Sequence, residues 1–214
     1  MPDQVVKGLP QRQSLRNLHY ALLTEDTKEA LSYETPKPLV GAISAKVSPT
    51  SNQEKLWADD AIFDIAANLG EVTFETEIVA LPIKAQAVLL GHKYENGVMT
   101  MTDTDEPPYL AIGFMSMPQP NRFRLVWLYK GKFSLLEDEY ATATDAATWR
   151  NAKLKATFVK RDHDGQWQVI ADSGDDGFAG TADDWFKAVY APPTATPGSA
   201  PTPANGENTP KERK

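Results

Sequence analysis

Residues 71–80 carry the clearest hydrophobic pattern in the chain. Val72, Phe74 and Ile78 alternate with four polar residues, Glu71, Thr73, Glu75 and Glu77. Successive side chains of a strand point to opposite faces, so the pattern predicts a strand with one apolar and one polar face. This alternation is typical of an antiparallel sheet with one face in water.

Comparable patterns predict further strands along the chain, at residues 17–23, 39–47, 98–102, 109–117, 122–133, 152–161 and 167–171. Two dipeptides, Asn96-Gly97 and Asp164-Gly165, are typical of tight β-hairpin turns. We expect the second of them to join the last two strands.

The hydrophobic period changes at Pro82, a residue that suits the first turn of a helix because it needs no N–H donor there. Ile83, Ala87 and Leu90 recur at helical spacing, and Gly91 suits the helix end. The sequence therefore predicts one main helix at residues 82–90. Residues 183–190 predict a second, short helix near the end of the domain.

The two ends differ in composition from the middle. Residues 1–15 predict an extended N-terminal arm, and residues 191–214, rich in Pro, Thr and Ala, predict a disordered tail. We expect this tail to project outward and to be dispensable for folding. The middle, residues 16–190, fits one domain. Its fold class is mainly β, an antiparallel sandwich or barrel with one flanking helix.

The composition limits the classes of protein to which the chain can belong. The chain of 214 residues has a net charge of −7 and no cysteine. An acidic chain is poorly suited to gripping nucleic acid, whose phosphates are bound by Lys and Arg. We find neither a secretory signal nor an apolar run of the ~18 residues that a membrane helix needs. These features lead us to expect a protein that is made in a cytosol and is not bound to membranes.

No catalytic, cofactor or metal motif stands out. The three histidines, His19, His92 and His163, are far apart, and we expect His92 to interact with the helix end and His163 to be solvated. The carboxylates at Glu71, Glu75 and Glu77 and the pair Asp59-Asp60 are typical of a solvated acidic surface rather than of acid–base catalysis. We therefore expect a protein that is not an enzyme and has no cofactor.

One segment approaches a calcium-binding loop. In the run Asp172–Gly177, Asp172, Asp176 and Gly177 fit the EF-hand spacing. Gly174 occupies a ligand position, Asp183 stands where a bidentate Glu belongs, and no helix is predicted to enter the loop. A flexible acidic loop is the favoured interpretation.

Several segments, taken in order, resemble the phi13-type major tail tube proteins of siphophages. The matching segments are NLHYALLTEDT (17–27), PLVGAISAKVSPTSNQEKLWADD (38–60), NLGEVTFETEIVALPIKAQAVLLGH (68–92), PPYLAIGFMS, RLVWLYKGKFS and DDWFKAVY. The resemblance covers roughly residues 15–190, one domain's length. The segment before Leu15 is longer than the family pattern, and the tail 191–214 also departs from it.

This resemblance implies two packed antiparallel sheets and a helix. It also implies a virion structural protein that is present in the host cytoplasm during assembly. The chain would be the self-assembling subunit of a long non-contractile tail tube built of stacked hexameric rings. Double-stranded DNA would pass through this tube during genome ejection without specific binding. The implied partners are other copies of the chain and the tape-measure, tail-terminator and distal tail proteins. The alternatives are a monomeric β-sandwich that binds a carbohydrate or a host surface, and a tube-end ring protein.

Residues 48–63 predict an assembly loop that is mobile in a free subunit and ordered between rings. The loop is polar up to Lys55, but Leu56 and Trp57 then lack an evident partner, and Asp59 and Asp60 follow them. Large apolar side chains on a loop often mark an interface. The alternative is that Trp57 folds back onto its own core.

The polar face of residues 71–79 predicts a lumen lining. Glu71, Thr73, Glu75 and Glu77 would face the channel and form an acidic band, which would let DNA slide past. The alternative places this face on the outer wall of the tube, where carboxylates aid solubility.

Overall fold

The computed structural model describes residues 14–58, 60–119, 122–136, 151–175, 178 and 180–191. Residues 1–13 of the predicted arm and all but Ala191 of the predicted tail lie outside these ranges, so the predictions for both ends are not addressed by the structure. Ser14 and Leu15, which the sequence assigned to the arm, already belong to the first strand.

The described chain is mainly β and its strands pair antiparallel, as predicted. Nine strands form one sheet in the order β2-β1-β8-β9-β10-β5-β4, with β3 on β1 and β11 on β9. Their bounds are β1 (Ser14–Asp26), β2 (Leu31–Tyr33), β3 (Lys37–Pro38), β4 (Ala42–Ala58), β5 (Ala61–Ile78), β8 (Leu110–Gln119), β9 (Arg122–Phe133), β10 (Ala152–Val159) and β11 (Gln168–Asp172).

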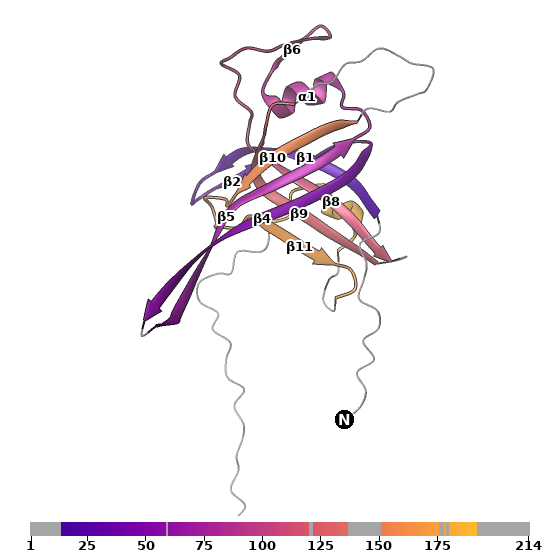
Figure 1. The fold of residues 1–214 in the computed structure, drawn as a ribbon. Coiled ribbons are helices and arrows are strands. Elements are labelled where there is room, and N and C mark those ends of the chain that lie inside the picture. The colour runs from indigo at the N-terminus through magenta and orange to yellow at the C-terminus, as the bar shows by residue number, and fades with distance from the viewer. Residues whose placement is uncertain are drawn as a thin grey trace, which may run out of the picture.

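The sheet is strongly curved but does not close, because no hydrogen-bonded ladder joins β4 to β1 within the described residues (Figure 1). The resemblance implied two packed sheets, and the structure instead has one curved sheet around the main core. That inner core includes Val72, Phe74 and Ile78 of β5, each fully buried. Ile112 and Leu128 join them from β8 and β9.

A second core lies on the outer face of β8 and β9. Trp127 and Tyr129 of β9 are fully buried there under the C-terminal segment. That segment contains α2 (Ala182–Trp185), which Thr181 caps by accepting a hydrogen bond from the Asp184 amide. The predicted helix at 183–190 is therefore shorter than expected, and its aromatic residues Trp185 and Phe186 provide the packing.

The main helix is confirmed as α1 (Ile83–Leu90), with Pro82 at its N-cap and Gly91 in the left-handed conformation at its C-cap. Leu89 and Leu90 are buried in the inner core. The Asn96-Gly97 turn is also confirmed, because it joins β6 (Lys93–Glu95) to β7 (Val98–Thr100) in a two-stranded ribbon. Both turn residues have positive φ, as this kind of turn requires.

The second predicted hairpin is wrong. Strands β10 and β11 both pair with the same side of β9, one after the other, rather than with each other. The Asp164-Gly165 turn does exist, but it closes a short excursion in which the Arg161 amide bonds the Gln166 carbonyl. Local turn chemistry predicted the turn, while pairing with β9 determined where the flanking strands lie.

The predicted loop at 48–63 is also wrong as a description of the backbone. Strands β4 and β5 run through it and pair from Ala42–Ile78 outward to Ala58–Ala61. Pro49, taken as a loop residue, sits at a register shift on an edge strand, where a missing N–H is tolerated. The result is a long hairpin whose distal part projects away from the body, opposite the end that carries α1 and β6 (Figure 1).

Candidate assembly surfaces

The distal β4–β5 hairpin, residues 51–69, is the most unusual surface of the molecule. Every described side chain from 51 to 56 and from 60 to 69 is exposed. Large apolar groups are among them, with Phe63 exposed by 75%, Ile65 by 50% and Leu69 by 45%. A soluble monomer rarely leaves a contiguous apolar surface bare, so this hairpin is a candidate contact surface.

Three of the four residues predicted for assembly, Leu56, Trp57 and Asp60, lie together at the hairpin's tip. Leu56 is 58% exposed, and the Trp57 backbone pairs with Ile62 close to the turn. Asp60 occupies that turn with a φ of 62°, and Asp59 lies outside the described residues. The segment that carries Trp57 therefore does not fold back over the inner core.

Sequence reasoning missed the apolar residues beyond the turn. Phe63, Ile65, Ala67 and Leu69 recur with a period of two, which is a strand signal. The pattern was readable, but Ala66 interrupts the alternation of apolar and polar residues, and the prediction of a loop at residues 48–63 concealed the strand. We call these four residues the apolar row.

The alternation along β5 is confirmed at its inner end. Val72, Phe74 and Ile78 are buried, while Glu71 and Glu75 are exposed. Thr73 and Glu77, the other two residues of the predicted lumen face, are partly exposed on the same side. The structure thus places the four residues on one outward face but does not test whether that face lines a lumen.

Lysines on the neighbouring strands change the electrostatics of this face. Glu75 of β5 lies between Lys155 of β10 and Lys46 of β4, and Glu77 is paired in register with Lys153. The Lys46 ammonium is 3.5 Å from a Glu75 carboxylate oxygen. Within the subunit this face therefore has rows of alternating charge rather than the predicted acidic band. One basic row lies on β4, the strand that precedes β5, and the other lies on β10, which is remote in sequence.

A groove opens on the inner face of the sheet where β1 and β4 fail to pair. Its volume is about 290 Å³. It is lined by aliphatic and small polar side chains together with one aromatic and one arginine: Ser14, Leu15, Ser44, Ala45, Val47, Phe114, Ser116, Arg124, Val126, Gln168 and Ile170. Ile170 is still 50% exposed, so the open end of the inner core is not fully covered.

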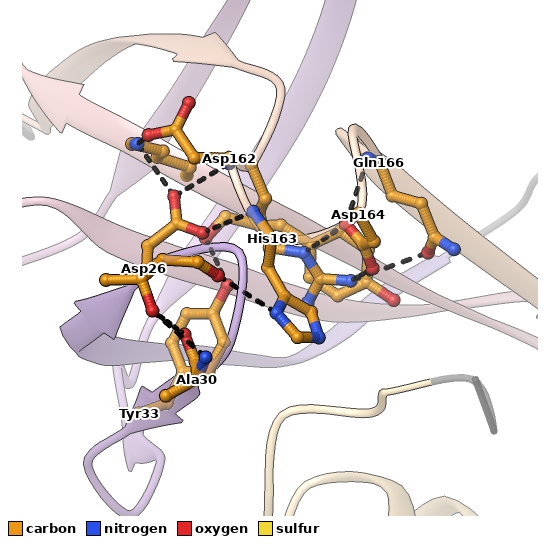
Figure 2. Close-up of polar contacts among 11 residues, drawn as sticks. Asp26, Ala30, Tyr33, Asp162, His163, Asp164 and Gln166 are labelled. Atoms are coloured by element: carbon orange, nitrogen blue, oxygen red, sulfur yellow. Dashed lines mark hydrogen bonds and ion pairs between the residues drawn. The ribbon is translucent and has the colours of Figure 1, made fainter.

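A polar cluster joins the β1–β2 turn to the 160–167 excursion (Figure 2). The Asp26 carboxylate accepts hydrogen bonds from the Lys130 ammonium at 2.7 Å and from the amides of Asp162 and His163, each at 3.0 Å. The His163 ring also contacts the Thr27 carbonyl. The prediction that His163 is simply solvated is therefore wrong. His163 belongs to this cluster, which we call the Asp26 cluster.

Electrostatics fit a structural role for the Asp26 cluster. Burial raises the pKa of Asp26, but bonds from the Asp162 amide, Lys130 and the His163 amide more than offset this, so its pKa lies below the ordinary value. Beside it, Arg161 is fully buried, stacks 3.5 Å from the Tyr129 ring centroid and donates to Asp164. Burial also raises the pKa of the nearby Tyr33 to about 12.

In the run Asp172–Gly177, which approaches the calcium-binding spacing, the first carboxylate is bonded to groups of the protein itself. The Asp172 carboxylate accepts hydrogen bonds from Arg122 at 2.8 Å, Arg124 at 2.9 Å and the Gly174 amide at 3.0 Å. Two guanidinium groups at this carboxylate disfavour the binding of a cation there. Asp176 and Gly177, the other residues that fit the spacing, lie outside the described residues. Among the residues that the structure describes, no group of three or more potential ligands has the arrangement of a metal site.

The remaining histidines are also held by local contacts. The His92 ring is buried after α1 and contacts the Asp105 carboxylate at 2.6 Å, which ties the helix end to the following loop. Bonds from Thr102 and His92 lower the pKa of Asp105 to about 2. His19 stacks on Phe186, with ring centroids 4.7 Å apart.

Comparisons with known proteins leave the family open. In the described part of the chain, neither helix has the length and apolar character needed to cross a membrane. The sequence matches no protein-family model, and no curated protein matches it significantly.

Proposed function

We propose that this chain is a structural subunit of a long, non-contractile phage tail tube, forming stacked hexameric rings around a channel for DNA. The observation that carries the proposal is the projecting hairpin with its bare apolar row, Phe63, Ile65, Ala67 and Leu69. In an isolated subunit this apolar surface is exposed to water, whereas burying apolar area is the main force for both folding and association. A neighbouring subunit would supply the missing cover.

The sheet edges support the same conclusion. Among the described residues, β4 pairs only with β5, so its outer edge has free backbone donors and acceptors along much of its length. The opposite edge, at β1, pairs with just the short strands β2 and β3 in the described part of the chain. Exposed edges promote aggregation unless they are paired. Pairing between unlike edges is head-to-tail, and a suitable rotation closes it into a ring.

The direction of the Glu71, Thr73, Glu75 and Glu77 face remains part of the proposal. We expect it to line the channel. The lysine rows revise the physical reason, because the lining would carry interleaved charges of both signs rather than an acidic band. Such a surface offers no continuous basic track for DNA phosphates to hold.

Electron microscopy of purified protein tests the proposal. Negatively stained samples should contain tubes of uniform diameter, and a cryo-EM map should show six subunits per ring with Glu75 facing the channel. A protein that remains monomeric at high concentration, even with an initiating tail complex, would contradict the tube function. It would favour the alternative of a monomeric module that binds ligands in the groove.

A further inference from the structure

The Asn96-Gly97 turn closes a short ribbon that stands apart from the main sheet. Strands β6 and β7 pair from Lys93–Thr100 to Glu95–Val98 and form a two-stranded sheet of their own. A two-stranded hairpin is only marginally stable in water. We therefore expect the ribbon to open locally, and each opening frees the backbone dihedral angles that the closed turn holds fixed.

Both residues of this turn are exposed to solvent. Asn96 has a φ of 50° and Gly97 a φ of 84°, so both lie in the left-handed region. A β-carbon built at Gly97 would meet no atom within 4 Å beyond its chain neighbours. Water and hydroxide therefore reach the turn freely, and no neighbouring side chain of the folded protein covers it.

An exposed Asn that is followed by Gly can lose ammonia without an enzyme. The Gly97 amide nitrogen, once deprotonated, attacks the side-chain carbonyl carbon of Asn96, and the side-chain nitrogen leaves as ammonia. The product is a five-membered succinimide ring, which water opens at either carbonyl to give aspartate or isoaspartate. The net reaction exchanges NH₂ for OH with water as the co-reactant. Gly favours the attack because it has no β-carbon to hinder its nitrogen.

The Asp164-Gly165 turn shows what protection from this chemistry looks like. Gly165 also has a positive φ, of 72°. The Asp164 carboxylate, however, accepts hydrogen bonds from Arg161 Nε and from the Gln166 amide, each at 3.0 Å. Ring closure at Asp164 would break these contacts, and its side chain is only 24% exposed. The structure thus distinguishes two turns that the sequence makes look alike.

We propose that Asn96 is a site of spontaneous deamidation, with aspartate and isoaspartate as its products. The proposal does not depend on the tube function. Either product adds one negative charge at the end of the molecule that carries α1 and β6 (Figure 1). Isoaspartate also adds a methylene group to the backbone, which changes the geometry of the two-residue turn that pairs the strands. The isoaspartate form should therefore lose the pairing of β6 with β7.

Peptide mapping by tandem mass spectrometry tests the proposal on the full-length protein during incubation at mildly alkaline pH. The Asn96 peptide should gain the mass of the exchange of NH₂ for OH, and its rate should rise with hydroxide concentration. The internal control is Asn68, which is equally exposed but is followed by Leu69 and lies in the long β4–β5 ladder. Asn205-Gly206 lies outside the described residues and falls in a separate peptide, so it does not enter the comparison.

The variant Gly97→Ala tests the chemical route. Its β-carbon would hinder the attacking nitrogen, so the loss of ammonia at Asn96 should slow. The positive φ makes Ala strain the turn, and that strain by itself would open the ribbon and speed the reaction, so a slower loss isolates the effect of the β-carbon. Loss at Asn96 that is no faster than at Asn68, or an unchanged or faster rate in Gly97→Ala, would overturn the proposal.

Discussion

Replacing Asp26 by asparagine tests whether the Asp26 cluster holds the fold together. The carboxylate is 5% exposed, and its two oxygens receive three hydrogen bonds, from Lys130, the Asp162 amide and the His163 amide. Asn has the same shape but only one acceptor oxygen. Its NH₂ group would face a donor wherever it is placed.

The cost follows from these contacts. At least one N–H donor of this partly buried cluster would lose its partner, which costs about 1 kcal/mol, the lower end of the range for a buried donor. Lys130, whose side chain is 11% exposed, would lose one of its two carboxylates but keep Asp162. Asp26→Asn should therefore lower the free energy of unfolding by about 2–4 kcal/mol, less than a fully unpaired buried charge would cost.

Urea unfolding followed by tryptophan fluorescence measures this change, with the m-value checked for constancy. The matched control is Asp162→Asn, which removes the other carboxylate on Lys130. That group is 64% exposed, so its loss should cost less than about 1 kcal/mol. Equal effects of the two substitutions, or no effect of either, would refute the assignment of Asp26 as the buried centre.

The same variant makes a prediction for acid. The folded-state pKa of Asp26 lies below its ordinary value of 3.8. A lowered pKa contributes stability that is fully present above the ordinary value and is lost as the pH falls through the folded-state pKa. The difference between wild type and Asp26→Asn should thus be constant near neutral pH and shrink below about pH 4. A difference that grows in acid would contradict the reasoning.

Three further predictions concern other sites. Asp172→Asn should cost about 2–4 kcal/mol at pH 7, and thermal melts should show that difference fading as pH falls from 3.8 toward the folded-state pKa of about 2. Gly131→Ala should cost about 1–3 kcal/mol in urea unfolding, because the new methyl group would lie 2.6 Å from the Phe158 ring. Phe63→Ser should leave the Tm unchanged but prevent tubes in negative-stain images.

Each of these has a matched comparison. Asp175→Asn changes a carboxylate that is 75% exposed near Arg122, and it should have almost no effect on stability. Gly70→Ala is the control for Gly131, since the nearest atom there is 3.4 Å away. Asn68→Ser alters the other face of the hairpin and should still permit tubes. Equal effects within any of the three pairs would remove the structural reason given for that pair.

The fold was predictable where local signals and long-range pairing agree. Val72, Phe74 and Ile78 alternate with polar residues, and the structure buries all three. Pro82 and Gly91 marked the main helix to within one residue. In each case the chemistry that sets the local conformation lies within the segment itself.

The single curved sheet was harder to predict from the sequence, because strand order depends on contacts between remote segments. β10 and β11 follow each other closely in the chain, yet both pair with β9 instead of forming a hairpin. A turn sequence such as Asp164-Gly165 fixes the backbone of a few residues. It does not determine which other strand pairs with the strands on either side of the turn.

The assembly surfaces show the same limit more sharply. The carboxylates of β5 could be placed on one face from sequence, but finding the lysines of β4 and β10 beside them required the register of three strands. The distal hairpin was harder still. Strand prediction relies on one face being buried in the same chain, and this hairpin has no such cover over residues 61–69. If its apolar row is buried only by a second copy, its alternation has a physical cause that a single chain does not contain. Predicting a loop is then the expected error for a strand that becomes buried only against another molecule.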